Sequence, residues 1–534
     1  MKRTLLIIAL IASVGAWAVP ARRGGFIRTA SDGTEKMVFL HGNEYFHYMT
    51  DDNGEWLDES TLAPLSAETK AARLAQYEQT KALRRAKPQY RGVGDKPNPA
   101  PRGLVIMVNF NNKSFVTPKD TIDAMHNADN FSRSYSYDRT VKYKGKDTTL
   151  HYSIKASGSA RKYFQDQSYG KYNPQFDVVG PYKVSQDYSY YGSNSDANAY
   201  LMIKEACDLA DNAGIDFSQY DNDNDGYVDF VYVIYAGYGE ADGGGESTVW
   251  PHQSDVSGWK YKHDGKFIGR YACGCELSFY SKTYAGVGTF CHEFSHVLGL
   301  PDLYETNKSP QGNHTLFEWD VMDYGVYNND ANTPPAYSAY ERFYMNWLTP
   351  RLLSEPEDVT LYPINEEEGM SLMISTTNTH NMSGWSPNPA TFYLLENRKK
   401  EGWDEYLYGE GLLITKITYS LTMWKSNSVN NNASSMGVDL LEAKANTTKY
   451  PAATDAFPAG ATEWTGYENH EVTDIERDSQ GVITFAYRGG KQTPTENIKI
   501  DSKNNSFKIL KEGKVVIIRN GRSYDLMGND ITKQ

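Results

Sequence analysis

In the middle of the chain the sequence reads Thr289-Phe-Cys-His-Glu-Phe-Ser-His-Val-Leu-Gly-Leu-Pro-Asp302. His292 and His296 are four residues apart, so on a helix their side chains project from one face about one turn apart. Two neutral imidazoles at this spacing can bind one metal ion, and Glu293 stands between them as a general base. The spacing therefore predicts a helix that binds Zn²⁺.

A third zinc ligand is expected shortly after this helix, because a catalytic zinc takes three protein ligands and keeps one position open for water. Gly299 can adopt a positive φ, end the helix and turn the chain back toward the metal. The turn at Pro301 would then present the carboxylate of Asp302. Glu305 is the alternative third ligand, but we favour Asp302.

A second motif, Asp320-Val-Met-Asp-Tyr-Gly325, follows the helix. The two motifs together resemble the metzincin metallopeptidases, whose zinc site rests on a methionine-containing turn. Metzincins usually place histidine at the third ligand position, whereas the immune-inhibitor-A-like (M6) peptidases are similar to this sequence in placing aspartate there. The resemblance implies an α+β metzincin-like peptidase domain. It also implies that Met322 lies beneath the metal as a hydrophobic floor and is not a ligand.

Tyr324 comes two residues after the methionine. Some metzincins carry at this place a tyrosine that assists the zinc and the oxyanion, so the resemblance makes Tyr324 a candidate catalytic residue. The alternative is an ordinary packed aromatic side chain in a chain that contains 40 tyrosines.

The N-terminus reads as a secretory signal peptide over residues 1–18. Two basic residues precede an apolar run over residues 5–14, and Ala16-Trp17-Ala18 supplies the small residues of a cleavage site. The apolar run is too short to span a bilayer as a helix. We therefore expect Val19 to begin an exported chain, secreted or at the cell surface, with no membrane span.

The 534 residues are too many for one ordinary domain. Residues 19–100 predict a propeptide with hairpin strands, a polar helix and a basic linker rich in Pro and Gly. Residues 101–350 form the expected catalytic domain. Short β segments separated by polar turns predict a β-sandwich over residues 355–488. Residues 497–534 predict a β tail that looks like a sorting signal for the type IX secretion machinery; the alternative is an ordinary pair of terminal strands.

Three segments set the expected frame of the catalytic domain. The apolar runs 103–110 and 230–236 predict buried strands. The apolar spacing over residues 198–213 predicts an amphipathic helix that covers the sheet.

An acidic loop lies between that helix and the second strand. Asp221, Asp223 and Asp225 stand at alternate positions before a glycine, as at the start of a Ca²⁺ loop. The EF-hand pattern then fails, because its twelfth position holds Tyr232 in place of Glu. One interpretation is a Ca²⁺ site completed by Asp229, and the other is a metal-free loop of Asx turns.

The four cysteines all fall in the expected catalytic domain, so we expect disulfides or buried free thiols. The net charge of −13 argues against nucleic acid as a partner. No cysteine precedes Cys207, so a propeptide could not block zinc with a thiolate and must use another group.

The sequence thus predicts a monomeric, secreted, zinc-dependent endopeptidase that is made as a zymogen and hydrolyses peptide bonds of extracellular proteins. The alternative is an extracellular binding or adhesion protein with a structural or degenerate zinc site.

Overall fold

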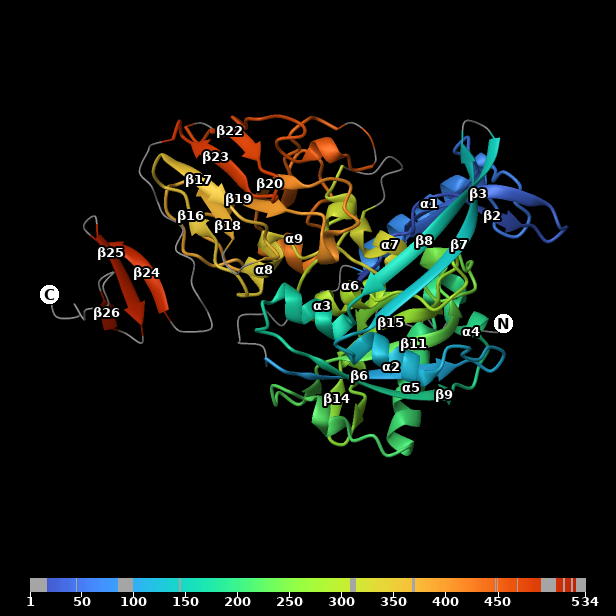
Figure 1. Ribbon diagram of the computed structural model, residues 1–534. Helices are drawn as coiled ribbons and strands as arrows, with labels where there is room; N and C mark the ends of the chain where they lie inside the picture. Colours follow the sequence, from blue (N-terminus) through green and yellow to red (C-terminus); the bar gives the residue numbers. More distant parts are fainter. Residues whose placement is uncertain are drawn as a thin grey trace, which may run out of the picture.

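The computed structural model describes residues 17–84 except 45, 99–143, 146–307, 314–366, and 370–490 except 447, 449 and 468, together with three strands between residues 506 and 524 (Figure 1). Most of the predicted signal peptide and of the basic linker lies outside the described residues. Across the described ranges, every helix is too short or too polar to span a membrane.

A six-stranded sheet is the frame of the central region. Its strands run in the order β1 (Trp17–Ala18), β12 (His252–Asp255), β15 (Arg270–Leu277), β11 (Val231–Tyr238), β6 (Arg102–Asn109) and β9 (Gln175–Lys183). The last four are parallel to one another, whereas β12 is antiparallel to β15 and β1 is antiparallel to β12. The predicted strands at 103–110 and 230–236 are confirmed as β6 and β11.

Both faces of this sheet are covered, as buried parallel strands require. Successive side chains of β6 enter two different cores, because neighbouring residues of a strand point to opposite faces. Ile106 packs on the side of α5 (Ala199–Asn212), which confirms the predicted helix over 198–213. Met107 packs on the side of α6 (Gly288–Val297), the predicted zinc helix.

Other elements of the central region were not all predicted. A long hairpin of β7 (Ser132–Tyr143) and β8 (Lys146–Ser157) extends toward the N-terminal strands (Figure 1). The remaining elements are α2 (Lys119–Asn127), α3 (Ala160–Gln167), α4 (Tyr188–Asp196), α7 (Asn328–Ala331), α8 (Ala339–Tyr344), β10 (Tyr227–Val228), β13 (Lys262–His263) and β14 (Lys266–Ile268).

The N-terminal region is a small antiparallel sheet followed by a helix. Its elements are β2 (Phe26–Thr29), β3 (Glu35–Asn43), β4 (Phe46–Thr50), β5 (Trp56–Leu57) and α1 (Ala67–Arg84). Apolar side chains of this region share one buried cluster with Trp250 and Val326 of the central region. The N-terminal region is therefore docked on the central region.

The C-terminal region holds two further sheets. One has the strands β16 (Arg351–Leu352), β18 (Ser371–Ser375), β19 (Thr391–Arg398), β20 (Gly411–Thr418) and β21 (Val438–Leu440), and the other has β17 (Glu357–Leu361), β23 (Ile483–Tyr487) and β22 (Val472–Arg477). Side chains of both sheets meet in one core. A short helix, α9 (Leu421–Lys425), follows β20. Beyond these lie β24 (Ser506–Lys511), β25 (Lys514–Arg519) and β26 (Arg522–Tyr524).

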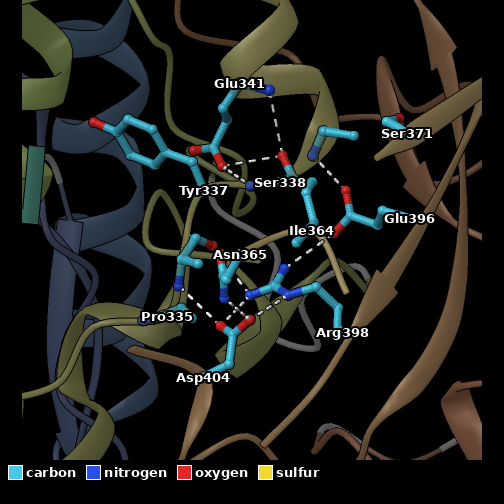
Figure 2. A network of polar contacts seen from close by, with 12 residues as sticks. Pro335, Tyr337, Ser338, Glu341, Ile364, Asn365, Ser371, Glu396, Arg398 and Asp404 are labelled. Carbon is cyan, nitrogen blue, oxygen red and sulfur yellow. Dashed lines mark hydrogen bonds and ion pairs between the residues drawn. The ribbon is translucent and has the colours of Figure 1, made fainter. Parts of the chain in front are cut away.

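A buried polar network joins the C-terminal region to the central region (Figure 2). Arg398, at the end of β19, contacts Asp404 through Nη2 at 2.5 Å and Glu396 through Nη1 at 3.1 Å. Asp404 also accepts a hydrogen bond from the backbone N–H of Ala336, and Glu396 accepts one from the N–H of Ala339. Arg398 thus neutralises the carboxylates that hold the loop before α8.

We expect Arg398→Met to destabilise the protein by about 3–5 kcal/mol, because it leaves two buried carboxylates without a cation. Lys399→Met is the matched control. Lys399 pairs with Glu366 and Glu401 near the surface, and losing such pairs costs about 0–1 kcal/mol. Urea unfolding followed by tryptophan fluorescence measures both, and equal shifts in the two variants would contradict the assignment.

Candidate metal centre

The helix α6 positions the two histidines of the predicted zinc site. Both side chains are buried, as is the carboxylate of Asp302. Gly299 has a φ of 102°, so a residue with a side chain would be strained there. The chain turns at this glycine and brings Asp302 back against the helix, as predicted.

Three potential ligand atoms converge at this place. The Nε2 atoms of His292 and His296 are 3.2 Å apart, and Asp302 Oδ1 lies 3.1 Å and 3.2 Å from them. Ligands bound at 2.0–2.2 Å to a tetrahedral zinc lie about 3.3–3.5 Å from one another. The triangle in the structure is therefore close to one face of a zinc coordination tetrahedron.

The positions of the ring protons of His292 and His296 leave electron pairs that face the centre of the triangle, as a bound cation requires. His292 Nδ1 lies 2.8 Å from the carbonyl oxygen of Val321, and His296 Nδ1 lies 2.8 Å from that of Leu300. A carbonyl can only accept, so each Nδ1 carries the proton and each neutral ring directs the Nε2 lone pair inward. Asp302 Oδ1 is buried and accepts no hydrogen bond. Three electron-pair donors that face one another fit Zn²⁺.

The methionine turn supports the site from behind. Val321, whose carbonyl holds His292, precedes the fully buried Met322. The backbone N–H of Leu303 donates to the carbonyl of Met322 at 2.8 Å, which ties the turn to the loop that carries Asp302. The turn therefore holds one ligand directly and a second through the neighbouring backbone.

Asn427, in the C-terminal region, is a site residue that the sequence analysis missed. Its Nδ2 donates to Asp302 Oδ2, and its Oδ1 accepts from the backbone N–H of Asp302 at 2.8 Å. The side chain is buried and lies just beyond α9. The separation of 125 residues leaves no local pattern that could have identified it.

Glu293 is fully buried beside the ligands. Burial raises the pKa of its carboxyl well above the usual range, and the nearby carboxylates of Asp302 and Glu44 raise it further. Its Oε1 accepts a hydrogen bond at 3.2 Å from the backbone N–H of Val19. A peptide group of the N-terminal segment therefore lies directly on the predicted general base.

The N-terminal segment crosses the site as an extra strand. Trp17 pairs with Gln253 and Ala18 with His252, so β1 lies antiparallel on the edge strand β12. The indole of Trp17 lies against His296, with ring centroids 5.0 Å apart. The carbonyl of Ala18 accepts a hydrogen bond from the hydroxyl of Tyr304.

The other two candidates from the sequence, Tyr324 and Glu305, and the buried His252 are not among the three clustered ligands. The ring of Tyr324 faces the guanidinium of Arg23, whose carbon is 3.5 Å from the ring centroid. His252 contacts the carbonyl of Trp250 and the hydroxyl of Tyr271, and burial lowers its pKa to about 4. Glu305 does not join the cluster of three potential ligands found among the described residues.

The acidic loop forms a second cluster. Carboxylate oxygens of Asp221, Asp223 and Asp225 lie within 4.8 Å of one another. Lys266 Nζ lies 2.7 Å from Asp221 Oδ2 and supplies one positive charge. Asp229 accepts hydrogen bonds from the backbone and side chain of Asn222.

The four cysteines are free thiols in the structure. Burial raises the pKa of each thiol, which keeps it protonated and unreactive. The expectation of buried free thiols, one of the two drawn from the sequence, is therefore confirmed for Cys207, Cys273 and Cys291, whereas Cys275 is half-buried.

Comparisons with known proteins agree with this geometry. Residues 93–349 match the family model of the immune inhibitor A peptidase M6 catalytic domain. The pre-pro-metalloprotease PrtV of Vibrio cholerae serotype O1 is 27% identical over 283 residues, which cover 45% of this chain and 30% of the relative. Immune inhibitor A of Bacillus thuringiensis subsp. alesti is 26% identical over 208 residues, which cover 33% and 30%. The matches thus span less than a third of either relative's length. Residues 93–349 thus form an M6-type peptidase domain, by their match to the model of that family.

Proposed function

We propose that this protein is a secreted zinc-dependent endopeptidase with a metzincin-like catalytic domain. The observation that carries the proposal is the triangle of His292, His296 and Asp302 beside Glu293, with a peptide group already lying on that glutamate. Family membership and the metalloprotease name of one relative support the same activity. Protein or peptide chains would be the substrates.

Glu293 has the place of a general base in this reaction. Zinc, when bound, would lower the pKa of a coordinated water and polarise the scissile carbonyl. Glu293 would accept the proton of the attacking water and deliver it to the leaving nitrogen. The N–H of Val19 already points at Oε1 of this carboxylate, where a leaving amine would need to be.

A purely structural zinc site is the alternative, as in a binding or adhesion protein. Structural zinc sites are closed by four protein ligands. Three potential ligands form the cluster within the described residues, which favours a catalytic site with an open position.

We also propose that the N-terminal region keeps the enzyme latent. Val19 lies on Glu293, where the leaving amine of a substrate would lie, and Arg22 anchors the segment. Its Nη1 lies 2.8 Å from Asp242 and its Nη2 lies 2.6 Å from Asp330, both in the central region. If the signal peptide is cut after Ala18, the new amino group of Val19 would lie on Glu293. The backbone amine would then block the active site, which is the role that a cysteine thiolate has in other zymogens.

Other predictions from the sequence stay proposals. A Ca²⁺ ion at Asp221, Asp223 and Asp225 would compete with Lys266 for the same carboxylates. The two sheets of the C-terminal region, which share one core, support a β-sandwich over 355–488. Export by the signal peptide and the type IX pathway, and a monomeric state, remain expectations.

The proposed activity is tested with unfolded casein and the protein processed between residues 84 and 99. We expect Glu293→Gln to lower kcat by about 10²–10⁴-fold, because it removes the general base but keeps the side chain's shape. The zinc content should not change. A chelator should abolish activity and added zinc should restore it. Activity that survives both the substitution and the chelator would exclude the proposed reaction.

The role of Asn427 is tested by zinc affinity. Asn427→Ala removes both hydrogen bonds that orient Asp302, so we expect the zinc Kd to rise about 10–100-fold. Asn432→Ala, in the same loop but exposed, is the matched control. Competition with a fluorescent zinc chelator measures both constants, and an unchanged Kd in Asn427→Ala would show that Asp302 needs no support.

Latency is tested on the unprocessed protein with a short fluorogenic peptide. Arg22→Ala breaks both buried ion pairs, so we expect activity before processing to rise at least about 10-fold, as loss of one partner of a buried pair costs several kcal/mol. Lys36→Ala also removes a propeptide charge, but Lys36 contacts the carbonyl of Leu62 within the N-terminal region. Equal activity in the two variants would mean that Arg22 does not hold the segment in the site.

A further inference from the structure

Tyr304 directs its hydroxyl at the N-terminal segment that crosses the metal centre. It lies two residues after Asp302, and its side chain is buried with 4% of its surface exposed. The hydroxyl donates a hydrogen bond to the carbonyl oxygen of Ala18. The nitrogen of the same peptide group, that of Val19, donates a hydrogen bond to Glu293 Oε1. One peptide bond is thus held from both sides, by Tyr304 at its oxygen and by Glu293 at its nitrogen.

This peptide bond is bound as a substrate would be. The segment pairs antiparallel with β12, an edge strand, and peptides commonly bind enzymes and receptors by adding a strand to such an edge. The next two carbonyl groups of the segment also accept hydrogen bonds. Trp250 Nε1 donates to the carbonyl oxygen of Val19 at 2.9 Å, and the hydroxyl of Tyr327 donates to that of Pro20 at 2.7 Å. The Ala18–Val19 bond therefore marks the position of a scissile bond.

We propose that Tyr304 is the oxyanion donor of the peptidase; this inference rests on the proposed function. The oxygen of water adds to the scissile carbonyl carbon, and the π-electron pair moves to the carbonyl oxygen. The phenolic hydroxyl of Tyr304 stabilises that negative oxygen by a hydrogen bond and stays neutral. Glu293 takes the proton of the water and transfers it to the nitrogen as the C–N bond breaks. The carbonyl re-forms as the C–N bond breaks, and the products are a carboxylic acid and an amine, which exchange a proton to become a carboxylate and an ammonium ion.

The geometry assigns different roles to the neighbouring tyrosines. Tyr324, the candidate from the resemblance to metzincins, packs against Arg23, four residues beyond Val19 in the segment. Tyr327 contacts the carbonyl of Pro20, which lies on the leaving-group side of the scissile position. Tyr304 is the tyrosine whose hydroxyl meets the reacting carbonyl.

The test compares Tyr304→Phe, Tyr324→Phe and Tyr327→Phe in protein processed between residues 84 and 99. The substrate is a peptide with the sequence of residues 15–21. We expect Tyr304→Phe to lower kcat about 10²–10³-fold with little change in KM, because a hydrogen bond made mainly in the transition state is lost. Tyr327→Phe should mainly raise KM, because its contact with the backbone is the same in the ground state and the transition state.

A second readout does not depend on turnover. A phosphinic analogue of the same peptide carries a negative oxygen at the scissile position, and we expect Tyr304→Phe to weaken its binding about as much as it lowers kcat. The zinc content and the visible spectrum of the cobalt-substituted protein should match the wild type.

Unchanged kcat and unchanged binding would overturn the proposal, and so would a kcat loss found only in Tyr324→Phe. Lost zinc or an altered cobalt spectrum would also overturn it and make Tyr304 a metal ligand or a structural residue. If the wild type binds the analogue but cleaves no peptide, the proposed peptidase function is wrong. Weaker binding of the analogue by Tyr304→Phe would then still show that Tyr304 contacts the negative oxygen.

Discussion

Two imidazole nitrogens and one carboxylate oxygen face one another at 3.1–3.2 Å in a buried place, and the rest of the site is arranged to keep them there. Lone pairs at this distance repel, and the burial of all three side chains keeps solvent from screening them. The backbone carbonyls of Val321 and Leu300 fix the protons on the outer nitrogens, so the inner ones stay available. The fold therefore holds an arrangement that a bound metal cation would make favourable.

That arrangement draws on all three regions of the chain. Asp302 depends on Asn427, which belongs to the C-terminal region, and Glu293 contacts Val19 of the N-terminal region. The central and C-terminal regions also share a buried ion network at Arg398 and one continuous apolar core. The C-terminal region is thus part of the support for the metal centre and not a separate appendage.

The sequence predicted what local spacing determines. The helix of His292 and His296, the turn at Gly299 and the strand of 103–110 follow from periodicity and from the conformations that glycine allows. Asn427 and Tyr304 could not be predicted in the same way. Asn427 reaches Asp302 across 125 residues, and Tyr304 is one of 40 tyrosines until a peptide group shows where its hydroxyl points. The long β7–β8 hairpin was missed because Arg and Tyr hold most of the less exposed positions of β7, so its alternation in burial is not an alternation of aliphatic and polar residues.

The contacts of the N-terminal segment are consistent with the proposed inhibition by a peptide that runs in the productive direction. A substrate leaves once its scissile bond is cut, because each half is held weakly. Here the part that follows Ala18 is held by contacts that cleavage does not touch: the buried ion pairs of Arg22 and the hydrogen bonds to the carbonyls of Val19 and Pro20. Cutting at Ala18 would convert the amide of Val19 into an amine that still reaches Glu293 and would be more strongly bound to its carboxylate. If the N-terminal region keeps the enzyme latent, as we propose, activation must remove all of that region, by a cut in the basic linker that precedes the central sheet.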